Sequence, residues 1–224
     1  VKSVVGHPMG AQVGYVAEGI FRSQDDIDNH AEQTGAGLGR IMWKDLNGDG
    51  KITEADQDWI YNPVPAISYG LNVYLEYFGF DLTLFFQGVQ GVDIISDLKK
   101  ETDLWSGLNI SNLNKGTRLL DAWSPTNTDS DIPALSIADN NNEKRVSSYW
   151  VEDGSYLKLK NIQLGYNLPE KALQKLHMER WRFFVSAQNV FTIHSRSFTG
   201  VDPENPNYGY PHALNITVGT SLNF

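Results

Sequence analysis

The segment ALNITVGTSLNF, residues 213–224, alternates between apolar and polar side chains almost without error. Successive side chains of a β-strand point to opposite faces, so this segment would have one apolar and one polar face. A soluble β-sandwich could carry the same pattern. The strand ends on the aromatic Phe224, however, as the last strand of a Gram-negative outer-membrane barrel often does. The segment therefore predicts an all-β protein, and other segments must show whether it is a barrel.

Four more segments alternate in the same way. The clearest pair flanks Phe78-Gly79, and a two-residue connection between alternating runs predicts a tight β-hairpin. These strands are long enough for the ~9–11 residues of a tilted membrane-spanning strand. The apolar phase slips between Leu159 and Ile162, which predicts a β-bulge there. The expected strands cover about 66–77, 80–90, 155–168, 179–192 and 211–224.

The connections between these strands alternate between short and long. Barrels of this class have short periplasmic turns and long extracellular loops. We therefore expect 91–150 and 193–211 to be extracellular, together with the region 1–65 that precedes the first strand. Five strands cannot close a barrel, since bacterial ones have at least ~8, so further strands are expected upstream. The opening residues show no signal peptide, and we expect the C-terminal part of a longer, exported chain.

Composition excludes several classes of function. A net charge of −9 argues against nucleic acid as a partner, because that needs clustered Lys and Arg. The chain has no Cys, its five His residues lack metal-ligand spacing, and no nucleophile elbow is present. We therefore expect no catalytic residues and no enzyme. No run approaches the ~20 apolar residues of a membrane helix, but alternating barrel strands do not need one.

Short motifs follow one another along nearly the whole chain. They include DLNGDGKI at 45–52, GFDLTLFFQG at 79–88, WSPTN at 123–127, VEDGSYLKLKN at 151–161, SAQNVFT at 186–192 and DPE at 202–204. Each motif is weak alone. In this order they resemble the C-terminal part of a SusC/RagA-type TonB-dependent outer-membrane transporter.

The resemblance implies a large antiparallel transmembrane barrel of about 22 strands with an N-terminal plug. It also implies an outer-membrane location in contact with lipid, a SusD-like surface lipoprotein as a lid, and energy from TonB with ExbB and ExbD. The implied function is the import of oligosaccharides or, in some members, peptides. Two alternatives stay open: a secreted all-β carbohydrate-active enzyme or binding module with a calcium loop, and a TonB-dependent siderophore receptor.

The segment DLNGDGKITEAD, residues 45–56, fits a calcium-binding loop. Oxygen-bearing side chains occupy positions 1, 3 and 5, and Gly50 occupies position 6, where the chain must turn sharply. Such hard oxygen ligands suit a structural Ca²⁺ better than a transition metal. Position 12 is Asp, whereas an EF-hand loop has Glu there. The alternative to a calcium site is an Asp/Asn/Gly turn that binds no ion. The expected ligands are the side chains of Asp45, Asn47, Asp49 and Asp56 and the backbone carbonyl of Lys51.

Aromatic residues in or beside the long loops are candidates for substrate contact. Flat aromatic faces can stack on sugar rings, and the alternatives are local packing or contact with a partner protein. These residues are Trp105, Trp123, Tyr149, Trp150, Tyr208 and Tyr210.

Two further expectations concern single positions in the predicted strands. Lys158 and Lys160 should face the barrel lumen, and we expect them to pair with acidic neighbours on adjacent strands rather than attract anionic substrate. Phe224 is expected to act as a signal for the outer-membrane assembly machinery.

Overall fold

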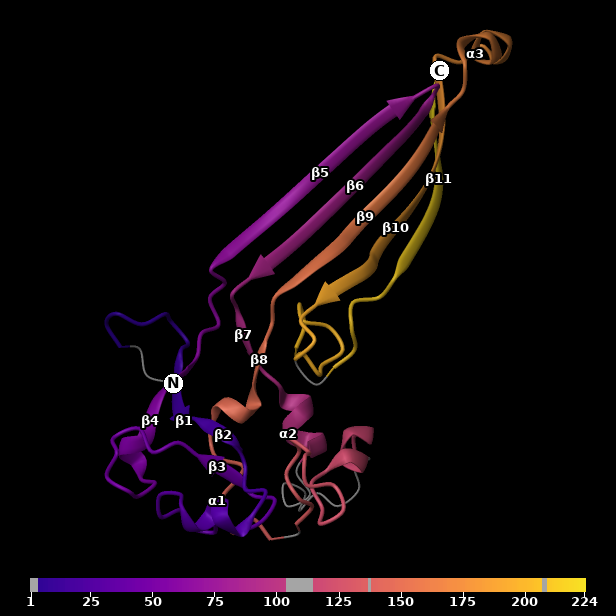
Figure 1. Ribbon diagram of the computed structural model, residues 1–224. Helices are drawn as coiled ribbons and strands as arrows, with labels where there is room; N and C mark the ends of the chain where they lie inside the picture. Colours follow the sequence, from indigo (N-terminus) through magenta and orange to yellow (C-terminus); the bar gives the residue numbers. More distant parts are fainter. Residues whose placement is uncertain (1–3, 104–114, 137, 207–208) are drawn as a thin grey trace. The chain divides into compact units, whose positions relative to one another are not determined.

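The computed structural model describes residues 4–103, 115–136, 138–206 and 209–224 (Figure 1). The chain forms two compact units. Unit 1 is built mainly from Val1–Val64 and Asp93–Asp153, and unit 2 from Pro65–Val92, Gly154–Asn205 and Gly209–Phe224. No helix in the described part of the chain is long and apolar enough to span a membrane.

Unit 2 is a single antiparallel sheet with the strand order β11-β10-β9-β6-β5 (Figure 1). Its strands are β5 (Ile67–Tyr77), β6 (Phe80–Gln90), β9 (Tyr156–Asn167), β10 (Arg180–His194) and β11 (Asn215–Asn223). All five predicted strands are present, so the expected all-β class is confirmed. The largest difference is at β11, which begins at Asn215 rather than near 211. The backbone before it is held elsewhere, because the His212 N–H donates to the Asp202 carboxylate.

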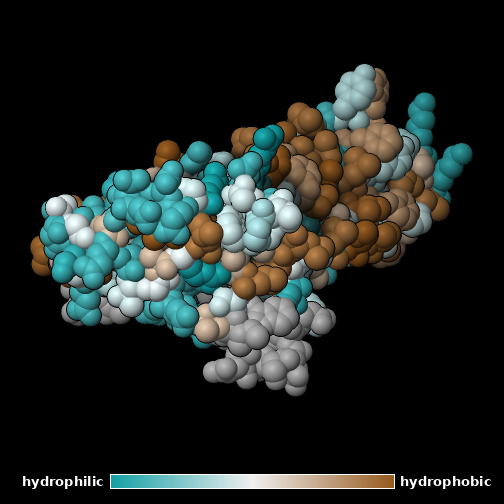
Figure 2. All heavy atoms as spheres, turned by 60° about the horizontal axis from the view of Figure 1, so that its bottom comes forward, coloured by the Kyte–Doolittle hydropathy of each residue, from teal (hydrophilic) through white to brown (hydrophobic). Residues whose placement is uncertain are grey.

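One face of the sheet is apolar from edge to edge. The register places Val218, Val185, Leu164, Leu82 and Leu75 in one row across all five strands. The row belongs to the only five-stranded sheet among the described residues, and no second sheet of that size covers it. Figure 2 shows exposed hydrophobic residues gathered in one broad area of that view. The apolar period of the sequence therefore produces an uncovered hydrophobic face.

The opposite face of the sheet is polar, and large side chains on it lie directly over glycine residues. Arg182 on β10 reaches across β9 and donates two hydrogen bonds to the Asp81 carboxylate on β6, one of them at 2.9 Å. Gly165 lies beneath this pair, and a Cβ there would come within 2.4 Å of both side chains. The ring of Phe184 covers Gly219 in the same way. Glycine at these positions is therefore explained by close side-chain approach.

The predicted bulge lies at Lys160. Asn161 pairs with Phe85 and Leu159 pairs with Phe86, so Lys160 is the extra residue on β9. An extra residue bends the bulged strand and re-aims its side chains. The bulge is thus confirmed, and it lies next to the cluster of charged residues described below.

The two connections at one end of the sheet are short, as predicted. Phe78 and Gly79 both adopt positive φ angles, 47° and 81°, as the tightest hairpin turns require. Between β9 and β10 the chain forms helix α3 (Glu170–Leu176), which ends at His177 in the left-handed conformation.

The described residues of unit 1 form three small two-stranded sheets and several short helices. The strand pairs are β1 (Gln12–Tyr15) with β4 (Gln57–Tyr61), β2 (Ala17–Ile20) with β3 (Ile41–Trp43), and β7 (Asp93–Ile95) with β8 (Val151–Asp153). The helices are α1 (Gln24–Asp28), α2 (Asp97–Asp103) and the short 3₁₀ segments Glu54–Asp56, Thr117–Asp121 and Ser148–Trp150.

A buried polar network joins the two halves of unit 1. Glu143 accepts hydrogen bonds from the backbone N–H of Ile41 and from the Arg40 guanidinium, both at 3.0 Å. The Ile41 carbonyl accepts from Gln33 and Asn141 at 2.8 and 2.9 Å. The segments Val1–Val64 and Asp93–Asp153 thus pack together in unit 1. The domain bounds expected from the sequence, 1–65 and 66–224, stay a prediction.

Candidate functional site

Two motifs distant in the sequence meet in unit 2. Lys158 on β9 is only 2% exposed, and its Nζ donates to both carboxylate oxygens of Asp202, at 3.1 and 3.0 Å. It also donates to Glu204 Oε2 at 2.8 Å. Lys160 binds the same Glu204 carboxylate at 2.7 and 2.8 Å. The positive charges of the two lysines thus neutralise the negative charges of the two carboxylates.

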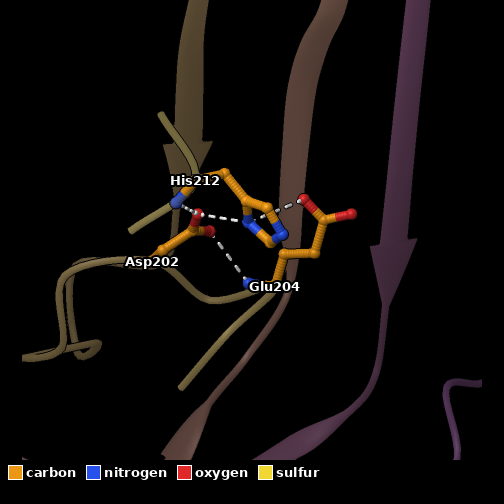
Figure 3. A group of neighbouring side chains, drawn as sticks. All are labelled: Asp202, Glu204 and His212. Carbon is orange, nitrogen blue, oxygen red and sulfur yellow. Dashed lines mark hydrogen bonds and ion pairs between the residues drawn. The ribbon is translucent and has the colours of Figure 1, made fainter. Parts of the chain in front are cut away.

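His212 ties the return of the same loop to this cluster. Its Nδ1 lies 3.0 Å from Asp202 Oδ2, and its backbone N–H donates to that oxygen at 3.2 Å. Figure 3 shows the imidazole between the Asp202 and Glu204 carboxylates. We call Lys158, Lys160, Asp202, Glu204 and His212 the loop latch. The latch fastens the connection between β10 and β11 to strand β9.

The loop latch has the residue types of a metal site but already contains a cation. The ligand atoms of Asp202, Glu204 and His212 lie within 4.8 Å of one another. The same carboxylate oxygens accept hydrogen bonds from the buried Lys158 ammonium. We therefore assign the cluster as an ion-pair network. The predicted pairing of Lys158 and Lys160 is present, but their acidic partners come from the loop rather than from adjacent strands.

The latch also sets the charge state of its acids. Burial alone would raise the pKa of the Asp202 carboxyl. Hydrogen bonds from Lys158 and His212 outweigh burial and hold that pKa at about 2, below the ordinary 3.8. The pKa of Glu204 is lowered in the same way, since the lysine hydrogen bonds outweigh its burial. Both acids are therefore ionised at neutral pH.

We expect the latch to open on acidification. A carboxyl whose folded-state pKa is depressed contributes stability that is complete above its unfolded pKa and lost as the pH falls through the folded pKa. For Asp202, facing Lys158, Lys160, Glu204 and His212, this window runs from 3.8 down to about 2. A nitroxide on Arg196→Cys in the full-length protein should gain mobility within that window. A transition centred well above 3.8 would contradict this assignment.

The predicted calcium loop is closed by hydrogen bonds to its own backbone. Asp45 accepts from the N–H groups of Gly48 and Gly50 at 2.7 and 2.9 Å, and Asp49 accepts from that of Lys51 at 2.9 Å. Gly50 has a φ of 79°, which provides the sharp turn expected at position 6. The loop therefore has the predicted turn, built from Asp and Asn side chains.

Asp56, the last expected ligand, is fully buried beneath this loop. It accepts hydrogen bonds from the backbone of Thr53 at 2.7 Å and of Leu46 at 3.1 Å. These bonds, above all that from Thr53, lower the pKa of its carboxyl. Among the described residues, only the loop latch brings three potential metal ligands of the Asp, Glu, His or Cys type within 4.8 Å. Calcium binding at 45–56 stays a prediction, with an oxygen donor set that suits the ion.

The calcium prediction is testable by calorimetry on the full-length protein. Wild type should bind Ca²⁺ at roughly 10⁻⁴–10⁻³ M, as weak extracellular sites do. Asp49→Ala should abolish binding because it removes a central oxygen ligand. Asp58→Ala, on strand β4 outside the loop, is the control and should bind as wild type does. Equal calcium affinity in wild type and Asp49→Ala would exclude the site.

Two of the candidate aromatic residues lie in the interior of unit 1. Trp123 and Trp150 are 8% and 1% exposed. Trp123 packs on the backbone of Gly39, where a Cβ would approach its ring to 2.6 Å. The Trp150 indole donates to the Arg145 carbonyl at 3.2 Å. Burial of these two rings favours the packing alternative over contact with substrate.

Tyr149 is the candidate that lines an open cavity. Lys99 Nζ lies 4.0 Å from the centre of its ring and donates to its carbonyl at 2.6 Å. Burial raises the pKa of the Tyr149 hydroxyl. The cavity has a volume of about 350 Å³, and charged residues of both signs line it. These are Lys99, Arg118, Glu18 and Asp131.

The other candidates have different surroundings. Tyr210 is exposed, and Trp105 and Tyr208 lie outside the described residues. Phe224 is exposed directly after β11, and its role in assembly stays a prediction.

Comparisons with known proteins point to one group of receptors. No protein-family model matches the chain. TonB-dependent receptor P3 of Formosa agariphila is 35% identical over 236 residues, which cover 98% of this chain and 22% of the receptor. TonB-dependent receptor SusC of Bacteroides thetaiotaomicron is 26% identical over 221 residues, covering 95% of this chain and 20% of SusC. The chain spans about a fifth of the length of these relatives.

Solved structures share the fold. A chain of the RagAB peptide transporter superposes with a TM-score of 0.75 at 22% identity, covering 96% of this chain and 22% of that one. The RagAB peptide importer in its open-open state gives a TM-score of 0.71 at 20% identity, covering all of this chain and 25% of that one. The relatives are receptors and transporters rather than enzymes, as the sequence predicts. By sequence and by fold, the chain matches one segment of TonB-dependent receptors of the SusC/RagA type.

Proposed function

We propose that this chain is part of an outer-membrane transporter that imports nutrients. The observation that carries the proposal is the apolar row from Val218 to Leu75 on an uncovered face of the sheet. Water would make such a face unfavourable, whereas lipid accepts it. The strands have 9 to 15 residues, enough to cross a bilayer when tilted. The polar face with Asp81 and Arg182 would then line the lumen.

Both edges of the sheet support a larger barrel. Within the described residues, β5 and β11 each pair on one side only. An unpaired strand edge is costly in lipid, because no water is present to satisfy its N–H and C=O groups. We propose that further strands of the same protein pair with both edges and close the barrel. The much greater length of the relatives supports this proposal.

The proposed partners follow from the relatives. TonB with ExbB and ExbD would supply energy, as the name TonB-dependent receptor suggests. A SusD-like surface lipoprotein would act as the lid, and the likeness to a chain of the RagAB transporter supports this. The long connections, including the one held by the loop latch, would then lie outside the cell.

The proposed substrate is an oligosaccharide or a peptide. The RagAB neighbour is named a peptide transporter. The sequence resemblance implies the import of oligosaccharides or, in some members, peptides. A secreted carbohydrate-active enzyme does not fit, since the relatives are receptors. The similarity to SusC also favours nutrient import over siderophore uptake.

Gene deletion and complementation with the full-length protein test this function. The deletion strain should grow poorly on one class of glycan or peptide as sole nutrient, and complementation should restore growth. A defect confined to iron limitation would favour a siderophore receptor instead. Normal growth of the deletion strain on every glycan and peptide, with the protein present in the wild-type outer membrane, would contradict nutrient import.

A further inference from the structure

We propose that unit 1 carries a binding subsite for a neutral sugar ring, built on Trp59. The inference rests on the proposed function and selects oligosaccharides among its substrates. Trp59 is a residue that the sequence pattern did not single out. Its surroundings give the site its shape and chemistry.

The register of β1 and β4 places the aromatic ring beside an amide. Val13 pairs with Trp59, and Tyr15 pairs with Gln57. Residues two apart on a strand share a face, so Val13, Trp59 and Gln57 point to the same side of this two-stranded sheet. Asp58 lies between the two β4 residues and points to the other side.

A third segment closes the hollow on the far side of β1. The Tyr15 N–H donates to the Val146 carbonyl at 3.0 Å, and Tyr15 forms a parallel bridge with Ser147. Gly14 permits this approach, because a Cβ there would lie 2.5 Å from the Val146 oxygen. The result is a cavity of about 390 Å³ with Trp59, Gln57, Gln12, Val13 and Val146 in its wall.

The cavity has the size and rigidity of a small-ligand site. Sites for small molecules have volumes of roughly 300–1,000 Å³, so this one could hold a sugar ring. The Trp59 ring is stacked on His7, with ring centres 3.7 Å apart and an interplanar angle of 17°. This contact fixes the orientation of the indole before a ligand arrives, which lowers the entropy cost of binding.

The lining chemistry favours a neutral, hydroxyl-bearing ligand. His7 covers one face of the Trp59 indole, and the other face would offer an apolar flat surface to the C–H face of a sugar ring. The Gln12 and Gln57 amides each offer both donors and acceptors, which matches hydroxyl groups. The remaining lining residues are Val4 and Ala11, so none of the residues lining this cavity is charged.

A charged ligand would fit this cavity poorly. A peptide terminus or an acidic sugar would lose hydration there without meeting a countercharge. The cavity beside Tyr149 differs in this respect, because Lys99, Arg118, Glu18 and Asp131 line it. These two cavities are thus chemically distinct, and the neutral one suits an uncharged sugar.

The test measures ligand binding by saturation-transfer NMR on the full-length protein in detergent micelles. The probes are neutral gluco-, galacto-, manno- and xylo-oligosaccharides, with a mixture of short peptides for comparison. Wild type should bind at least one oligosaccharide, and Trp59→Ala should weaken that binding roughly tenfold or more, as expected for a central aromatic contact. Trp59→Phe keeps an aromatic face and should lose less.

The matched control is Asp58→Ala, on the same strand but facing the other way, which should bind as wild type does. Each variant should also be folded. In electrophoresis of unheated samples, a folded barrel migrates differently from the unfolded chain, so equal mobility of wild type and variants excludes loss of binding through misfolding. The proposal is overturned if no neutral oligosaccharide binds, if Trp59→Ala binds as tightly as wild type, or if it loses peptide binding instead. Growth of the deletion strain and of the complemented strain on glycans or peptides then shows separately whether nutrient import still stands.

Discussion

We expect the Lys158→Met variant to release the loop between β10 and β11 from the sheet. The change removes the buried ammonium that binds both Asp202 and Glu204. Lys160 then remains the only lysine in the loop latch, and it pairs with Glu204. Removing one partner of a buried ion pair costs roughly 3–5 kcal/mol, because the remaining charge stays buried without compensation. The loop should therefore leave its bound position while the strands stay paired.

Limited proteolysis of the full-length protein measures this release. Cleavage within residues 195–214 should become much faster in Lys158→Met than in wild type. Lys171→Met is the matched control, since Lys171 lies exposed on helix α3. Adding Asp202→Leu to Lys158→Met should slow cleavage again. The positive charge of Lys160 then neutralises the one remaining negative charge, that of Glu204. Equal cleavage of wild type and Lys158→Met would show that the latch does not hold the loop.

The second large effect is expected on the apolar face of the sheet. Val218 lies near the middle of β11, and its side chain is 76% exposed. If this face meets lipid, Val218→Arg places a charge near the bilayer midplane, at a cost of roughly 2–4 kcal/mol. Thr217→Arg puts the same charge on the opposite face, where the polar lumen accepts it, and should cost far less.

Folding of the full-length protein into lipid vesicles compares the two variants. Unheated electrophoresis separates folded from unfolded barrel, so the folded fraction can be followed against urea concentration. We expect Val218→Arg to lower the urea midpoint much more than Thr217→Arg does, with Val218→Leu close to wild type. Equal midpoints for the two arginine variants would contradict a lipid-facing Val218.

The strands could be predicted because their signal is local. Alternation in β5 and β6 lies in the sequence itself, and the turn at Phe78 and Gly79 joins them directly. The bulge at Lys160 was also visible as a slip in the apolar phase. These features depend on neighbours a few residues away, and a single sequence contains them in full.

The partners in the loop latch could not be predicted in the same way. Lys158 and Asp202 are 44 residues apart, and Asp202 lies in an irregular loop without a period. The only signal was that LKLK at 157–160 and DPE at 202–204 both belong to the family-like motifs. Two lysines in one motif and two acids in the other could have suggested that the motifs pair.

Unit 1 shows the same limit for aromatic residues. Trp123 and Trp150 lie in polar, irregular stretches, and such a sequence does not show whether a ring is buried or exposed. Their burial depends on contacts such as that between Glu143 and the Ile41 backbone, 102 residues apart. Trp59 was not among the candidates, because its place beside Gln57 and Val13 depends on the pairing of β4 with β1.

Spin-label scanning along β11 tests most directly whether the sheet is a membrane wall. The chain has no Cys, so single cysteines at 216, 217, 218, 221 and 222 can each carry a nitroxide in the full-length protein in lipid bilayers. The account predicts that labels at Ile216, Val218 and Leu222 are accessible to lipid-soluble oxygen. Labels at Thr217 and Ser221 should instead respond to a water-soluble nickel chelate. Loss of this alternation, with the first set shielded from oxygen or open to the chelate, would contradict the barrel assignment.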